Sequence, residues 1–153
     1  MARNREMERA LKAFEKDIKK WTNKLEKKIV PKKIRGLGLQ TLSMLMEKSP
    51  VDEGVFRGNW NVGVNIKDRS TKVPKKKKGE KKKANRNAID PVKFAEGEGR
   101  IGSVKLGDTI NISNALPYAM RLEFGYSAQR PDGMVRTTIM ELSFWLKKQN
   151  EKL

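Results

Sequence analysis

The sequence has neither cysteine nor histidine in its 153 residues. Without histidine there is no imidazole general base, no Ser-His-Asp triad and no imidazole metal ligand. Without cysteine there is no thiolate nucleophile, no disulfide, no zinc ribbon and no iron–sulfur cluster. Among the usual metal sites, a hard-cation site built from carboxylates stays open.

Long apolar runs are missing as well. No stretch approaches the roughly 20 apolar residues of a membrane-spanning helix, and residues 1–6 are not followed by the apolar segment of a signal peptide. We therefore expect a soluble intracellular protein with no membrane partner. The length suits a single domain over residues 1–153, and 37% hydrophobic residues suffice for a modest core.

Positive charge is abundant and uneven. The chain carries 35 Lys and Arg against 18 Asp and Glu, a formal charge of +17. Eleven basic and two acidic residues fall within residues 67–86, which therefore account for +9 of the total. Because like charges this dense repel and the segment has few apolar residues to bury, we predict a mobile lysine-rich loop over residues 67–88.

This loop has two interpretations. It is either a solvated surface insertion or an arm that neutralises nucleic-acid phosphates without reading sequence. No aromatic residue is interleaved for base stacking, and arginine is scarce for bidentate base contacts, so any contact with double-stranded DNA would be non-specific. The lysines that such an arm would use are Lys75, Lys76, Lys77, Lys78, Lys81, Lys82 and Lys83.

Residues 4–30 are predicted to form a long amphipathic helix. Apolar side chains recur at spacings of four and three residues and so share one helix face: Met7, Leu11, Phe14, Ile18, Trp21, Leu25 and Ile29. We expect Pro31 to kink or break the helix, since the residue before a proline avoids helical geometry, and a second helix to follow over 32–48. The apolar face packs either on the protein's own sheet or on another subunit.

Two segments alternate as half-buried strands do, residues 59–66 and 109–114. In the first, Trp60, Val62, Val64 and Ile66 are expected on the inner face. A short helix is predicted over 117–124. A last helix is predicted over 134–149, with one apolar face made of Val135, Ile139, Leu142 and Leu146.

The order of these elements predicts an α+β fold: a long N-terminal helix, a small antiparallel sheet, a short helix and a C-terminal helix. Residues 91–104 stay ambiguous, with a short helix as one option. Two strands make a poor isolated sheet. Either a third strand lies near 104–106 or 126–130, or sheets join across subunits, and both options favour an oligomer.

Catalytic motifs are weak. Residues 97–102 match G-x-G-x-x-G, but a turn at Gly107-Asp108 leaves no room for the helix that a dinucleotide site needs, so we expect a flexible bend there. Asp90 faintly suggests a metal nuclease, yet the second acidic element is missing. We expect no enzyme and no cofactor.

Three dense motifs carry more information. They read SPVDEGVFRGNW over residues 49–60, NALPYAMRLEFGYS over 114–127 and PDGMVR over 131–136. Proline ends a helix at Pro50, Gly54 permits an unusual backbone φ, and Pro131-Asp132-Gly133 is a turn built from fixed φ, side-chain capping and a permissive glycine.

In this order the motifs resemble the tail-completion or head–tail joining (neck) proteins of long-tailed double-stranded DNA phages. That family typically shows Ser/Thr-Pro-Val-Asp-Thr-Gly running into a Trp-led strand, then Asn-x-Leu-Pro-Tyr-Ala with Leu-Glu-Phe/Tyr-Gly, then Pro-x-Gly-Met-Val-Arg before the last helix. The resemblance covers residues 30–146 apart from the lysine-rich loop. Glu53 departs from the usual Thr, and Val55 from a frequent Arg.

The resemblance implies a virion structural protein in the neck, made in the host cytoplasm. It implies a homo-oligomeric ring, a hexamer in the expected form, between the head-side connector or adaptor and the tail terminator or tube proteins, with DNA passing through its lumen. The residues assigned to its shared core and interface are Pro50, Asp52, Gly54, Trp60, Pro117, Tyr118, Leu122, Glu123, Gly125, Gly133, Met134 and Arg136. The alternative is a stand-alone nucleic-acid-binding protein that uses the lysine-rich loop, and a third option is the carboxylate-metal nuclease.

Overall fold

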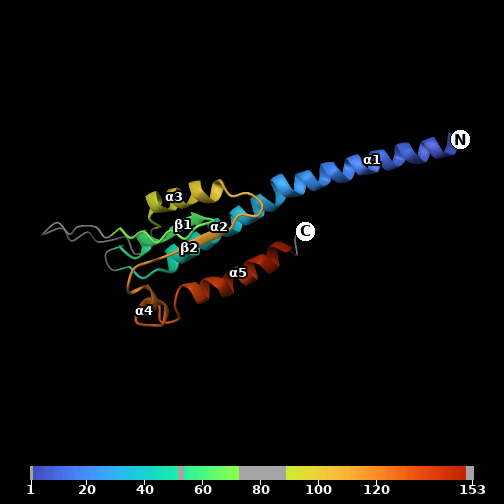
Figure 1. Ribbon diagram of the computed structural model, residues 1–153. Helices are drawn as coiled ribbons and strands as arrows, with labels where there is room; N and C mark the ends of the chain where they lie inside the picture. Colours follow the sequence, from blue (N-terminus) through green and yellow to red (C-terminus); the bar gives the residue numbers. More distant parts are fainter. Residues whose placement is uncertain (1, 52–53, 73–88, 151–153) are drawn as a thin grey trace.

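The computed structural model describes residues 2–51, 54–72 and 89–150 (Figure 1). Its longest feature is helical from residue 2 to residue 48, as α1 (Ala2–Lys24), a π-helical segment η1 (Leu25–Ile29) and α2 (Val30–Lys48). Figure 1 shows α1 extending away from the other elements, whereas α2 runs into their midst. The predicted α+β fold is confirmed.

Pro31 modifies this long helix without ending it. A proline lacks the N–H that the helix needs, and its ring collides with the carbonyl four residues earlier. The segment just before the proline is π-helical and therefore wider than an α-helix. In it, the Val30 N–H donates to the Leu25 carbonyl five residues earlier. Pro31 then occupies the first turn of α2, where its missing N–H is not required. The irregularity and a helix over 32–48 were predicted; that helix is α2, but it continues from α1 through η1 and is not separated from it.

The sheet has two strands in the described residues. β1 (Asn61–Val64) pairs antiparallel with β2 (Ile110–Ser113), and Val62 stands opposite Ile112. No third strand forms at 104–106 or 126–130 in this part of the chain. The ambiguous segment before β2 is a helix, α3 (Pro91–Gly102).

One core joins these elements. α2 contacts both α3 and α5 (Val135–Asn150), α3 contacts β1, and the short α4 (Ala119–Glu123) leads into the turn before α5. The buried apolar side chains form one cluster: Leu42, Leu45, Met46, Phe56, Trp60, Val62, Ile101, Leu116 and Met134. α2 therefore lies at the centre of the domain.

The first strand is shorter than predicted. Residues Arg57–Asn59 form a 3₁₀ turn, η2, and Asn65 adopts a left-handed φ of 63° that ends the strand. Ile66, expected inside, is therefore turned outward and is 69% exposed. Asn61, which the same alternation puts on the outer face, is buried, and its side chain donates to the Ser70 carbonyl and accepts from Lys93 Nζ.

Candidate assembly interface

Glu123, at the end of α4, caps the beginning of α5. Its carboxylate accepts hydrogen bonds from the backbone N–H groups of Met134 and Val135, both at 2.8 Å, and of Arg136 at 3.1 Å. Desolvation by burial raises the pKa of the Glu123 carboxyl, but these donors together outweigh it and leave the pKa below its usual value. The charge also interacts favourably with the helix dipole. The second and third motifs are thus two halves of one junction.

Two glycines make this junction possible. Gly133 has φ +78°, and a Cβ there would lie 2.5 Å from the Glu123 carbonyl oxygen. Gly125 has φ +92°, and its Cβ would lie 3.0 Å from the Pro131 carbonyl. Both positions combine a left-handed backbone with a close approach, so any other residue strains the turn.

Arg136 closes the junction from outside. Its Nη2 donates to the Glu123 carbonyl at 2.7 Å, its Nε approaches the carboxylate at 3.3 Å, and its guanidinium lies 5.4 Å from the Phe124 ring centroid. Met134, between these polar contacts, is fully buried in the core. The motif residues therefore fix where α5 starts and which side it turns to the core.

The first motif is anchored on Ser49, the buried residue that follows α2. Its hydroxyl donates to the Leu45 carbonyl and accepts from Trp60 Nε1 at 2.7 Å, while Arg57 Nη2 donates to its carbonyl. Trp60 is 5% exposed, which places it in the monomer core. Gly54 has the predicted unusual φ, +78°.

The first and second motifs also meet. The Phe56 ring lies 5.9 Å from Trp60 and 6.0 Å from Tyr118, centroid to centroid, and Asn114 Nδ2 donates to the Phe56 carbonyl. Gln129 was missed by the sequence analysis. The Gln129 side-chain amide accepts a hydrogen bond from the Val51 N–H and donates one to the Val51 carbonyl, as the backbone of a neighbouring strand would.

Of the predicted site residues, Glu123, Gly125, Gly133, Met134 and Arg136 meet in the junction before α5, and Pro50, Tyr118 and Leu122 meet beside the first motif. Pro50 and Leu122 are half-buried, Tyr118 and Pro117 are exposed, and Pro50, Tyr118 and Leu122 line one pocket. Asp52 lies outside the described residues, as do the seven lysines assigned to DNA contact. The start of the predicted loop, residues 67–72, is described and follows the sheet.

Two apolar surfaces have no cover within the described chain. The first is the apolar stripe of α1, whose members are 47–63% exposed: Met7, Leu11, Phe14, Ile18 and Trp21. The second is the exposed half of α5, whose apolar side chains are 38–68% exposed and lie on either side of the polar Arg136, Ser143 and Lys147: Val135, Ile139 and Leu146 on one side, Met140 and Phe144 on the other. The option that the stripe packs on the protein's own sheet is thus wrong. The inward side of α5 carries the buried Thr138 and the half-buried Leu142 and Trp145, next to the buried Met134 that precedes it.

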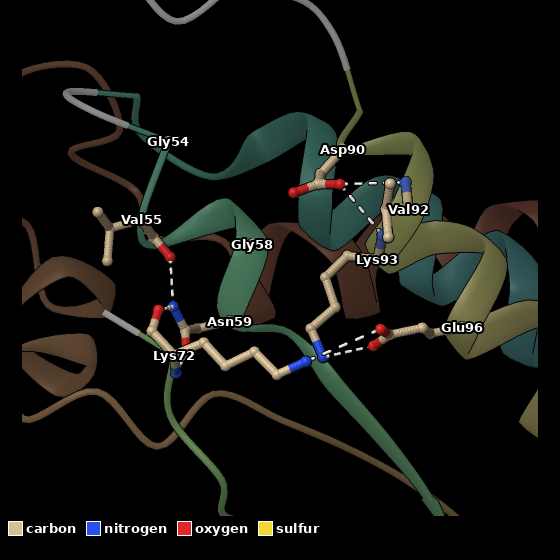
Figure 2. Close-up of a pocket in the computed structure, with 9 residues that line it drawn as sticks. All are labelled: Gly54, Val55, Gly58, Asn59, Lys72, Asp90, Val92, Lys93 and Glu96. Carbon is tan, nitrogen blue, oxygen red and sulfur yellow. Dashed lines mark hydrogen bonds and ion pairs between the residues drawn. The ribbon is translucent and has the colours of Figure 1, made fainter. Parts of the chain in front are cut away.

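A cleft of about 350 Å³ that contains several charged side chains lies between η2 and α3 (Figure 2). Asp90 accepts from the N–H groups of Val92 and Lys93, so its carboxylate is the N-cap of α3. Glu96 lies 2.9 Å from Lys93 Nζ, and this hydrogen bond lowers its pKa. Figure 2 shows Lys72 reaching the same carboxylate. Both acids are engaged, and in the described residues no group of three potential ligands could hold a metal.

The glycine fingerprint is helical. Residues 97–102 lie within α3, and a Cβ at Gly97 would lie 2.5 Å from Leu42 Cδ2. The predicted flexible bend is therefore wrong, because the glycine serves close packing of α3 on α2. A phosphate loop before a helix is not formed here.

Comparison with known proteins gives no support for or against any family, since no family model, no curated protein and no solved structure matches the chain. In the described part of the chain, no helix is long and apolar enough to cross a membrane.

Proposed function

We propose that this protein is a virion structural component of a phage neck. It assembles into a homo-oligomeric ring that joins the tail to the head connector around the DNA channel. The observation that carries the proposal is the uncovered apolar stripe of α1. Contiguous apolar surface of this kind, with polar residues around it, is typical of surfaces that bind another protein.

The junction around Glu123 supports the family resemblance on which this proposal also depends. The Leu-Glu-Phe-Gly and Pro-x-Gly-Met-Val-Arg elements occur together in the family, and here the acid of one caps the helix opened by the other. This contact gives a physical reason why the two elements occur together, which argues against a chance match of short motifs.

The chemistry of the described residues also favours a structural role. The acids near the cleft serve as a helix cap and an ion-pair partner, and Asp68, another acid near the sheet, pairs with Arg100 at 2.7 Å. A nuclease centred on Asp90 would need a carboxylate free of the α3 cap. We therefore propose no enzymatic activity.

The alternative function is non-specific nucleic-acid binding through the lysine-rich loop. One observation favours it: Asn59 fixes Lys72, its side chain accepting from the Lys72 N–H at 2.7 Å and donating to the Lys72 carbonyl. The lysine-rich segment therefore departs from a defined point beside the cleft. Such an arm would add salt-dependent DNA affinity to a ring without being needed for assembly.

The test is the mass of the purified full chain in solution, alone and with the products of genes adjacent to its own. We expect a discrete oligomer of ring shape by light scattering and electron microscopy. A protein that stays monomeric under both conditions, and never joins heads or tails, would contradict the proposal.

A matched variant separates the two functions. Replacing the seven lysines Lys75, Lys76, Lys77, Lys78, Lys81, Lys82 and Lys83 by serine leaves the contacts of Lys72 in place. The neck function predicts unchanged oligomers, whereas the alternative predicts that the variant loses DNA affinity and with it its role.

A further inference from the structure

The apolar stripe of α1 is narrow and strictly periodic. At about 100° per residue, its side chains all fall within an arc of about 80°. A helix that packs on a globular core shows an apolar face wider than about 100°, whereas a stripe confined to the a and d positions of a heptad is typical of a coiled coil. With the half-buried Leu25, the stripe fills six successive d and a positions: Met7, Leu11, Phe14, Ile18, Trp21 and Leu25. The partner that fits it is therefore another helix with the same repeat.

This repeat ends where the helix enters the domain. After Leu25, the next d and a positions hold Lys28 and Lys32, both exposed, and between them Pro31 is the first buried residue of the helix. Before this point, residues 5–24 are all exposed, and Figure 1 shows α1 extending away from the other elements. The stripe thus belongs to the projecting part of the helix, and no element of the described chain covers it.

The side chains that flank the stripe suit a second copy of α1 running in the same direction. In a parallel, in-register pair, each g position faces the e position five residues later in the other helix. Ala10 then faces Glu15 of the second copy, and Asp17 faces Thr22. No like charges meet across this contact.

A copy running in the opposite direction meets like charges. Antiparallel helices bring e positions next to e positions and g next to g. If the whole stripe is covered, Met7 of one helix lies opposite Leu25 of the other. Glu15 then faces its own equivalent, and so does Asp17. Because such juxtapositions are unfavourable, the flanking charges select the parallel orientation.

The stripe also offers enough area for a specific contact. Its members from Met7 to Trp21 are 47–63% exposed. They present on the order of 550 Å² per copy, given about 150–250 Å² for each large aromatic side chain and somewhat less for the aliphatic ones. A pair of helices then removes on the order of 1,100 Å² from water, and the flanking polar residues bring the total near the roughly 1,200–2,000 Å² of specific interfaces.

We propose that α1 of one copy packs along α1 of a neighbouring copy in a parallel, in-register coiled coil. The inference rests on the homo-oligomer of the proposed function and specifies one of its contacts. Rotation about the axis of a ring carries each α1 onto the next without reversing it, so helices that meet along that axis are parallel and in register. An antiparallel pair needs a two-fold axis across the helices, which a ring with a single rotation axis lacks.

The absence of cysteine permits a direct test of this orientation. Met7→Cys places a single thiol near the tip of α1, and in the parallel contact two such thiols lie side by side. Most of the oligomer should then become disulfide-linked under mild oxidation. In the antiparallel contact the two positions lie about 27 Å apart, and Met7→Cys would instead link to Leu25→Cys in a mixture of the two single variants. Lys16→Cys, on the far side of α1, is the matched control and should link at least about fivefold less.

A charge placed in the stripe gives a second readout. Ile18→Asp should weaken self-association at least about tenfold, because it puts a carboxylate into the apolar contact. Lys16→Asp, on the far side of the same helix, should leave association unchanged. Sedimentation velocity gives the association constants, and circular dichroism checks that each variant keeps its helices.

The outcomes separate this contact from the proposed function. A dominant link between Met7→Cys and Leu25→Cys overturns the inference in favour of antiparallel helices. An oligomer that forms no link through Met7→Cys and tolerates Ile18→Asp also overturns it, and leaves the neck function standing. A chain that is monomeric, and stays so with the products of adjacent genes, overturns both.

Discussion

Replacing Glu123 by glutamine tests the junction between α4 and α5. Glutamine keeps one of the two acceptor oxygens. Each carboxylate oxygen receives two donors, the N–H groups of Met134 and Val135 on one and the N–H and Nε of Arg136 on the other. The amide NH₂ of glutamine therefore faces two donors that have no acceptor, and the charge at the start of α5 is lost.

The expected cost follows from these contacts. A hydrogen bond to a charged group contributes about 1.5–3 kcal/mol, and an anion at a helix N-terminus about 0.3–1 kcal/mol. The Glu123 side chain is 12% exposed, so water can replace few of the hydrogen bonds that the substitution removes. Allowing for the bonds that glutamine keeps, we expect a loss of about 3 kcal/mol in the free energy of unfolding at pH 7, or a fall of about 6–12 °C in Tm.

The pH dependence sharpens the test. Because the folded-state pKa of Glu123 is depressed, its contribution is fully present above the pKa of an unfolded glutamate, about 4.3. It is lost as the pH falls through the lower folded value. The difference between wild type and the glutamine variant should therefore shrink below about pH 4.

Urea denaturation followed by circular dichroism at pH 7 and pH 3 measures this difference. The control is Glu141→Gln on the same helix, whose carboxylate is 56% exposed and should cost less than about 1 kcal/mol. A Glu123→Gln loss below about 1 kcal/mol, or one equal at both pH values, would refute the reasoning.

Further substitutions test the backbone, the core and the exposed stripe. Gly133→Ala should cost more than about 3 kcal/mol, because it combines positive φ with a clash on a carbonyl, whereas Gly36→Ala, in open space on α2, should gain about 0.5–1 kcal/mol by urea denaturation. Thr138→Val should raise the free energy of unfolding by up to about 1 kcal/mol, since its buried hydroxyl has no hydrogen-bond partner among the described residues; a loss would contradict this. Trp60→Ala should cost about 3–5 kcal/mol in thermal unfolding. Trp21→Ala, 61% exposed, should cost less than about 1 kcal/mol yet weaken self-association at least tenfold by sedimentation.

Periodicity and turn chemistry predicted the long N-terminal helix, α4, α5 and two strands, but they left α3 ambiguous and made the first strand too long. They could not predict what covers the apolar stripe, because a spacing of four and three residues defines a face and says nothing about its partner. Proline at position 31 argued for a separate helix, whereas the hydrogen bond from the Val30 N–H to the Leu25 carbonyl shows that a π-helical segment lets the helix continue. At Gly97, a motif pattern suggested a bend, whereas packing against Leu42 decides the outcome.

The residues that join the motifs were only partly visible in the sequence. Gly54 and Gly133 follow from turn chemistry, and Trp60 from strand alternation. The capping role of Glu123 has no local signal, because its donors lie 11 to 13 residues later. Gln129 pairs with a backbone 78 residues away, which no spacing rule reports.

The unbroken helix from α1 through α2 has a mechanical consequence. Forty-seven residues of helix make a rod about 70 Å long, with one end in the centre of the domain and the other outside it (Figure 1). A force applied at the N-terminal tip of α1 is therefore transmitted through α2 to α3 and α5. Between the tip and α2 lies η1, where the helix has a different pitch. A small change of angle at η1 becomes a large displacement at the tip, so this segment sets the reach and direction of the whole arm.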